Sequence, residues 1–107
     1  MENTICCIIS TIPTKSSAEQ IAKILLEEHL VACVQIGSPM TSHYVWNNIQ
    51  ECETELPVII KTSKKVLDKL FERYVQLHTY ECPEWVVLEG VASEAYYRWV
   101  EQSCNGV

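Results

Sequence analysis

Four apolar runs along the chain predict the strands of one β-sheet. Ile5–Ile9 is continuous and rich in β-branched residues, which is typical of a strand that is covered on both faces. The same character recurs in Leu30–Ile36, Leu56–Thr62 and Trp85–Glu89. Between the second and third runs, Ser42–Gln50 is more polar but still aromatic and β-branched, so it predicts a strand extension that leads into a hairpin. We expect the tip of this hairpin in the acidic stretch Gln50–Glu55.

Three segments with apolar residues at helical spacing lie between and after these runs. The first ends near His29. Its start has two candidate capping boxes, Ser17 with Gln20 and Ser16 with Glu19. The second follows Ser63, and one of its faces carries Leu67, Leu70, Phe71, Tyr74 and His78. The third is short and begins near Ser93.

The order of these elements predicts an α+β fold. Two β-α-β units followed by a C-terminal helix are typical of a ferredoxin-like split βαβ sandwich, with both crossover helices on one face of the sheet. A chain of 107 residues is long enough for one such domain, so residues 1–107 are expected to form it. The other face of the sheet is left bare although its strands are apolar, so we expect copies of the chain to cover it in a closed homo-oligomer.

Composition and charge narrow the class of protein. Hydrophobic residues make up 48% of the chain and charged residues 21%, which is ordinary for a globular protein. With 8 Lys+Arg against 14 Asp+Glu, the formal charge is −6, and no basic cluster matches a row of phosphates. We therefore expect neither a nucleic acid nor a membrane as a partner. Without a secretory signal, the six cysteines are expected to stay reduced in the cytoplasm.

The stretch HTYECPEW, residues 78–85, is the richest in chemistry and has two interpretations. As a structural turn, it places His78 in the last turn of a helix, where an imidazolium meets the negative end of the dipole, and Pro83 ends the segment before a strand. As a metal site, it offers an imidazole, a thiol and a carboxylate from His78, Cys82 and Glu84, ligands that suit copper or zinc.

Other candidate binding residues lie elsewhere in the chain. Tyr44 and Trp46 are two residues apart in a predicted strand and therefore face the same side, where they serve either interface packing or ligand stacking. Lys61 ends a strand and is either an exposed lysine or a cation directed toward Glu81 and Glu84. The sequence has no nucleophile elbow, phosphate-binding glycine loop or H-E-x-x-H helix, so we do not expect an enzyme.

Four segments, taken in order, resemble one protein family. ACVQI at 32–36, SHYVW at 42–46, IIKT at 59–62 and HTYECPE at 78–84 are similar to the CutA family, the divalent-cation tolerance proteins, and the resemblance covers Cys7 to Trp99. It implies a ferredoxin-like subunit and a homotrimer with sheets packed at its centre, similar in assembly to PII signalling proteins. It also implies a cytoplasmic protein linked to tolerance of copper and other divalent cations, with no catalytic reaction.

The family's motifs map onto particular residues of this chain. Its H-P-Y-E-x-P-E pattern falls on His78, Tyr80, Glu81, Pro83 and Glu84, and its other elements on Tyr44, Trp46 and Lys61. There are departures from the family's pattern: Thr79 replaces a proline, Asn48 a glycine, and Trp85 a smaller aliphatic residue. Ser10 stands where some members have a thiol, and a hydroxyl is a weaker ligand for soft metals.

We therefore predict a non-enzymatic, trimeric protein that binds copper or another divalent cation in clefts between subunits. The predicted metal ligands are His78, Cys82 and Glu84, and the predicted lining residues are Tyr44, Trp46, Lys61, Tyr80 and Glu81. Two alternatives stay open. One is a PII-like sensor that binds a small anionic metabolite with Lys61 as charge partner, and the other is a trimeric scaffold without a ligand.

Overall fold

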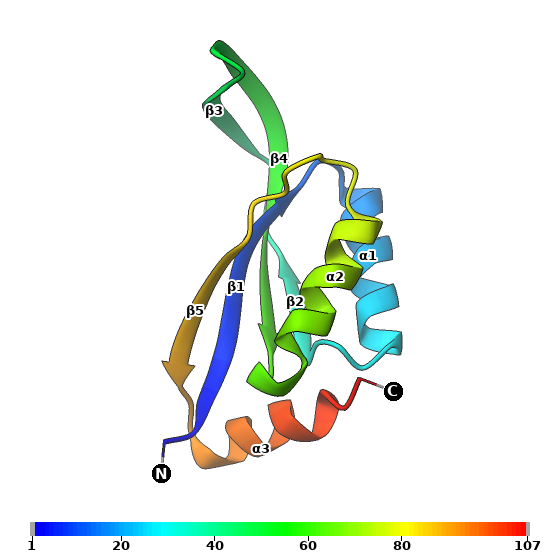
Figure 1. Ribbon diagram of the computed structural model, residues 1–107, viewed down its shortest axis with the longest axis vertical. Coiled ribbons are helices and arrows are strands. Elements are labelled where there is room, and N and C mark those ends of the chain that lie inside the picture. The colour runs from blue at the N-terminus through cyan, green and yellow to red at the C-terminus, as the bar shows by residue number, and fades with distance from the viewer. Residues whose placement is uncertain (1, 107) are drawn as a thin grey trace.

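The computed structural model describes residues 2–106, which form one antiparallel sheet and three α-helices (Figure 1). The elements are β1 (Thr4–Ile12), α1 (Lys15–Glu27), β2 (Cys33–Ile36), β3 (Met40–Trp46), β4 (Ile49–Thr62), α2 (Leu67–Leu77), β5 (Val86–Val91) and α3 (Glu94–Ser103). The strand order is β2-β4-β1-β5, and β3 pairs with the first half of β4. No helix within residues 2–106 has the length and apolar character needed to cross a bilayer.

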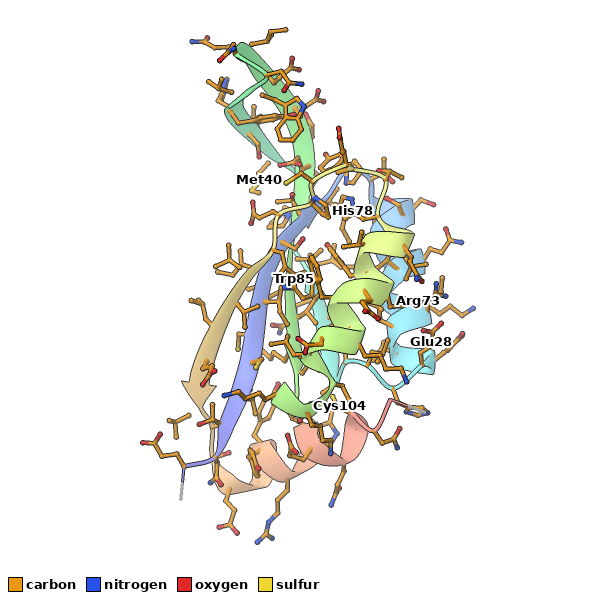
Figure 2. All side chains as sticks on the ribbon, viewed as in Figure 1. Glu28, Met40, Arg73, His78, Trp85 and Cys104 are labelled. Carbon is orange, nitrogen blue, oxygen red and sulfur yellow. The ribbon has the colours of Figure 1, made fainter. Side chains whose placement is uncertain are left out.

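Helices α1 and α2 lie side by side on one face of the sheet, and α3 crosses its lower end (Figure 1). The core forms between these layers, where Ile8 of β1 is paired with Ile60 of β4 and both are almost fully buried against the helices. Arg73 of α2 donates hydrogen bonds to both carboxylate oxygens of Glu28 at the end of α1, which ties the two helices together (Figure 2). This contact holds the pKa of Glu28 below its ordinary value.

All the predicted strands and helices are present, but α1 begins earlier than expected. Its N-cap is Thr14, whose hydroxyl accepts a hydrogen bond from the backbone N–H of Ser17 at 3.1 Å. Ser16 and Ser17 lie inside the first turn, so neither predicted capping box is correct. The helix starts immediately after Pro13 because Thr14 already supplies the hydroxyl that a cap requires.

The hairpin of β3 and β4 also differs from expectation. Its tip is Asn47–Asn48, with both residues in the left-handed region at φ of 52° and 65°, and the acidic stretch Gln50–Glu55 lies within β4. Asparagine tolerates positive φ better than most residues, so it can form this two-residue turn. The hairpin projects beyond the rest of the sheet (Figure 1), and we call its segment 40–55 the arm.

The turn at the tip predicts a small stabilising effect for Asn48→Gly. Glycine adopts positive φ without the steric cost that asparagine retains, but it also has more freedom in the unfolded chain. We expect a net gain of ~0.5 kcal/mol in the free energy of unfolding, measured by urea denaturation. A loss of stability would show that the asparagine side chain contributes more at this turn than its backbone conformation costs.

The sheet face opposite α1 and α2 carries a continuous apolar row. Ile59, Ile9 and Val86 are neighbours across β4, β1 and β5, and their exposed fractions are 42%, 38% and 46%. Leu88, two residues further along β5 and therefore on the same face, is 51% exposed. Exposed apolar side chains gathered in one row on a sheet are typical of a surface that another protein chain covers.

Candidate functional site

A groove of about 1130 Å³ lies between the arm and the loop that joins α2 to β5. Five aromatic residues line it: Tyr44, Trp46, Phe71, Tyr80 and Trp85. Its carboxylates are Glu55, Glu81 and Glu84. Among the residues that the structure describes, no lysine or arginine lines the groove. The groove is therefore acidic and aromatic.

Glu55 is the central carboxylate, although it lies in a stretch that we expected to be an exposed hairpin tip. Only 7% of the residue is exposed. One of its oxygens accepts hydrogen bonds from the hydroxyls of Tyr80, at 2.8 Å, and Thr11, at 3.2 Å. Within residues 2–106, no Lys, Arg or His forms an ion pair with it. A buried carboxylate without a cationic partner is costly, so this position favours a cation in the groove.

The carboxylate of Glu55 affects the protonation of its hydrogen-bond partner Tyr80. Burial, followed by the hydrogen bond to Glu55 and the charge of that carboxylate, raises the pKa of Tyr80 well above its ordinary value. The phenol therefore keeps its proton at neutral pH and donates it to Glu55. This pair joins the loop to β4 of the arm.

His78 holds the start of the loop rather than facing a ligand. It is the C-cap of α2 with extended backbone, so it is not in the last helical turn as predicted, and it is 8% exposed (Figure 2). Its Nε2–H donates to the carbonyl of Thr11 at 2.8 Å, and its Nδ1 accepts from the backbone N–H of Tyr80 at 3.0 Å. Both ring nitrogens are thus used, and a metal would have to displace one of these bonds.

Ser10 fixes the far end of the loop. It is fully buried, and its hydroxyl donates to the backbone carbonyl of Glu84 at 2.6 Å while accepting from the phenol of Tyr74, also at 2.6 Å. Burial raises the pKa of Tyr74 to about 12, so the phenol stays neutral and remains a donor. Ser10 therefore positions Glu84, and its side chain is not available to a metal.

Glu84 is a carboxylate of the loop whose pKa is changed by its environment. Its side chain lines the groove, where desolvation and then the charge of Glu55 raise its pKa above the ordinary value. The residue as a whole is exposed, so the desolvation is local to the side of the groove. A cation bound near both carboxylates would reduce the electrostatic repulsion between them. Glu81 and Cys82 also line the groove, and both are exposed.

The aromatic residues divide into two groups. Trp85 packs against Phe71 and Tyr74 of α2, each with ring centroids 5.1 Å away, so its added bulk is directed partly into the core (Figure 2). Tyr44 and Trp46 project from the arm and are 41% and 44% exposed. The prediction that Tyr44 and Trp46 share one side of a strand is confirmed because both line the groove.

Lys61 does not line this groove. Its side chain lies on the sheet face opposite α1 and α2, 5.7 Å from the ring centroid of Tyr96 in α3. One alternative from the sequence was that Lys61 is directed toward Glu81 and Glu84. Within one chain, Lys61 does not approach either residue. Within one chain, an anion in the groove would lack Lys61, the charge partner that the metabolite-sensor hypothesis names.

The residues fit a divalent cation only in part. No group of three His, Cys, Asp or Glu side chains within residues 2–106 is arranged to hold a metal ion. The predicted set of His78, Cys82 and Glu84 is not such a group, since the imidazole is already engaged. The groove instead offers carboxylate oxygens, which suit hydrated or partly coordinated cations.

Comparisons with known proteins agree with this fold. The family model described as "CutA1 divalent ion tolerance protein" matches residues 6–103. A "Divalent-cation tolerance protein CutA" from Thermus thermophilus is 36% identical over 97 residues, covering 90% of this chain and 94% of that protein. "Protein CutA" from Homo sapiens is 31% identical over 98 residues, and the aligned part covers 91% of this chain and 55% of that protein.

Solved structures of similar proteins superpose over nearly the whole chain. CutA from Synechococcus elongatus is 34% identical, with a TM-score of 0.88 and coverage of 98% of this chain and 95% of that one. CutA from Xylella fastidiosa is 30% identical, with a TM-score of 0.90 and coverage of 94% and 98%. The fold and the family match therefore place the chain among mixed α/β proteins of the divalent-cation tolerance class. The chain belongs to the CutA family.

Proposed function

We propose that the chain forms a homotrimer whose acidic groove binds divalent cations, copper among them, without catalysing a reaction. The observation that carries this proposal is the nearly buried carboxylate of Glu55, which has hydroxyl partners but no cationic one. Glu84 faces the same groove with a raised pKa, and Glu81 and Cys82 lie at its edge. The family's name supports a role in divalent-cation tolerance.

The assembly part of the proposal rests on the apolar row of Ile9, Ile59 and Val86. Burial of such a row against two other copies would cover the free face of a ferredoxin-like sheet, whose strand order β2-β4-β1-β5 supports that classification. The PII-like assembly expected from the family resemblance has the same support. The arm would then extend beyond its own subunit, so that neighbouring copies contribute to the clefts.

We also propose that the protein is cytoplasmic and that it binds its ligand without catalysing a reaction. The six cysteines are free in the structure, which supports a reducing compartment such as the cytoplasm. The Cys82 thiol in the groove has no hydrogen-bonded general base among residues 2–106, which supports a binding role rather than nucleophilic catalysis. We propose that the single domain of 107 residues acts as the subunit.

Calorimetric titration of reduced, metal-free protein with Zn²⁺ or Cu²⁺ tests the cation site. We expect Glu55→Gln and Glu84→Gln each to weaken binding by at least ~10-fold, equivalent to about 1.4 kcal/mol, because each removes a charge from the groove. Glu19→Gln is the matched control, since this exposed glutamate of α1 lies outside the groove. Unchanged affinity in both groove variants would exclude this site.

The pH dependence of binding should follow Glu84. Its raised pKa means that this carboxylate takes up a proton earlier than an ordinary one as the pH falls, and the neutral form no longer attracts a cation. The raised pKa of Glu84 also contributes to the stability of the folded state at low pH. This contribution is lost as the pH rises through the raised pKa. Glu84→Gln should therefore fold normally at pH 7.

A further inference from the structure

His43 and Cys52 form a pair of potential metal ligands outside the carboxylate cluster. They are direct partners in the pairing of β3 with β4, so their side chains leave the same face of the arm. The distance from the Sγ of Cys52 to the Nε2 of His43 is 3.9 Å. Strand alternation puts this pair on the face of the arm opposite Glu51, Glu53 and Glu55, although His43 also contributes to the lining of the groove. Both residues are exposed.

The separation of the two atoms matches ligands of one ion better than a strong hydrogen bond. With bond lengths of about 2.3 Å to sulfur and 2.0 Å to nitrogen, a tetrahedral angle separates the two ligand atoms by roughly 3.5 Å, and wider angles by about 4 Å. The observed 3.9 Å falls in this range. Neither side chain has another hydrogen-bond partner among residues 2–106, so both remain available to an ion.

The electrostatics of the arm favour a positive ligand. Its segment 40–55 contains Glu51, Glu53 and Glu55 but no lysine or arginine. Desolvation, followed by the charges of these three glutamates, raises the pKa of Tyr44, which lies on the same face of the arm as they do. A cation that approaches the His43–Cys52 pair is therefore attracted before it is coordinated.

We propose that His43 and Cys52 anchor a thiophilic cation, Zn²⁺ or Cu⁺, on the arm. A thiol and an imidazole are ligands for such ions and poor ligands for Mg²⁺ or Ca²⁺. On binding, the thiol of Cys52 releases its proton to solvent and coordinates as the thiolate, while His43 coordinates as the neutral imidazole. Water completes the coordination. This site uses none of the groove carboxylates, so it does not depend on the function proposed above.

Titration of the reduced, metal-free, full-length protein with Cd²⁺ tests this pair, because a thiolate bound to Cd²⁺ gives an ultraviolet charge-transfer absorption. We expect this absorption in the wild type and its loss in Cys52→Ser. In His43→Leu, which keeps the thiol, the affinity should fall by ~10–100-fold. Cys33→Ser is the matched control, since Cys33 of β2 lies outside both the arm and the groove. Zn²⁺ added to the Cd²⁺-loaded protein should abolish the band by displacement.

Two results would overturn the proposal: an absorption that persists in Cys52→Ser, or an affinity that His43→Leu leaves unchanged. The first would assign the signal to another thiol, and the second would make Cys52 a single-ligand site. Both residues are exposed, so circular dichroism should show folded variants. Glu55→Gln/Glu84→Gln should retain the band, which separates the failure of this site from the failure of the groove.

Discussion

Ser10→Ala should cost about 2–4 kcal/mol in the free energy of unfolding, which is a large effect for the loss of one oxygen atom. The substitution leaves the buried phenol of Tyr74 without its acceptor and the carbonyl of Glu84 without its donor. Each unpaired buried group costs roughly 1–3 kcal/mol, and the smaller alanine leaves no polar replacement. Urea denaturation followed by circular dichroism measures the difference.

A double-mutant cycle separates the two halves of this contact. Tyr74→Phe removes the phenol but leaves Ser10 bonded to Glu84, so it should cost about 1 kcal/mol. Combined with Ser10→Ala, it should restore part of the lost stability because no phenol is then left unpaired. Ser16→Ala, at an exposed position of α1, is the control and should stay within ~0.5 kcal/mol of the wild type. Additive effects of the Ser10 and Tyr74 variants would contradict the bridging role of Ser10.

His78→Ala should cost about 3 kcal/mol and should act on the fold more than on cation binding. The variant leaves the carbonyl of Thr11 and the N–H of Tyr80 without their partners. Strand β5 pairs with β1 only as far as Ile9 and Val86, so no strand replaces the lost donor at Thr11. The ring of His78 also packs 4.7 Å from that of Tyr80, and this contact disappears.

The comparison with Glu84→Gln distinguishes a positioning histidine from a metal ligand. His78→Gln provides an amide that can donate to Thr11, so it should recover part of the stability. If His78 only positions the loop, the folded His78→Gln protein should bind Zn²⁺ within a few-fold of the wild type, while Glu84→Gln binds it more weakly. A folded His78→Gln protein that has lost its Zn²⁺ affinity would make the imidazole a ligand.

The sequence was sufficient to predict the elements that local pattern determines. The β-branched run Ile5–Ile9 lies within β1, and the last helix begins immediately after Ser93, as the sequence pattern predicts. The hairpin turns at Asn47–Asn48 and not in the acidic stretch Gln50–Glu55, because the turn preference of asparagine determines the tip more strongly than charge does. Asparagine pairs at a possible turn carry a local signal that was available from the sequence.

The site was harder to predict because its central residue depends on distant contacts. Glu55 is buried by Thr11 and Tyr80, which are 44 and 25 residues away in sequence, so its neighbours in β4 give no sign of its role. The same holds for His78, whose ring nitrogens are occupied by backbone groups that only the folded chain brings close. The sequence motif identifies the loop. The hydrogen bonds of the folded chain decide which of its side chains are available to bind a ligand.

Native mass spectrometry of the reduced protein, first metal-free and then with added Zn²⁺, tests the central claim most directly. It reports the number of chains in the assembly and the number of ions bound in one spectrum. A homotrimer that takes up Zn²⁺, with uptake reduced in Glu55→Gln/Glu84→Gln, is the predicted result. A monomer of 12.3 kDa, or a trimer that retains no ion attributable to these carboxylates, would contradict the account.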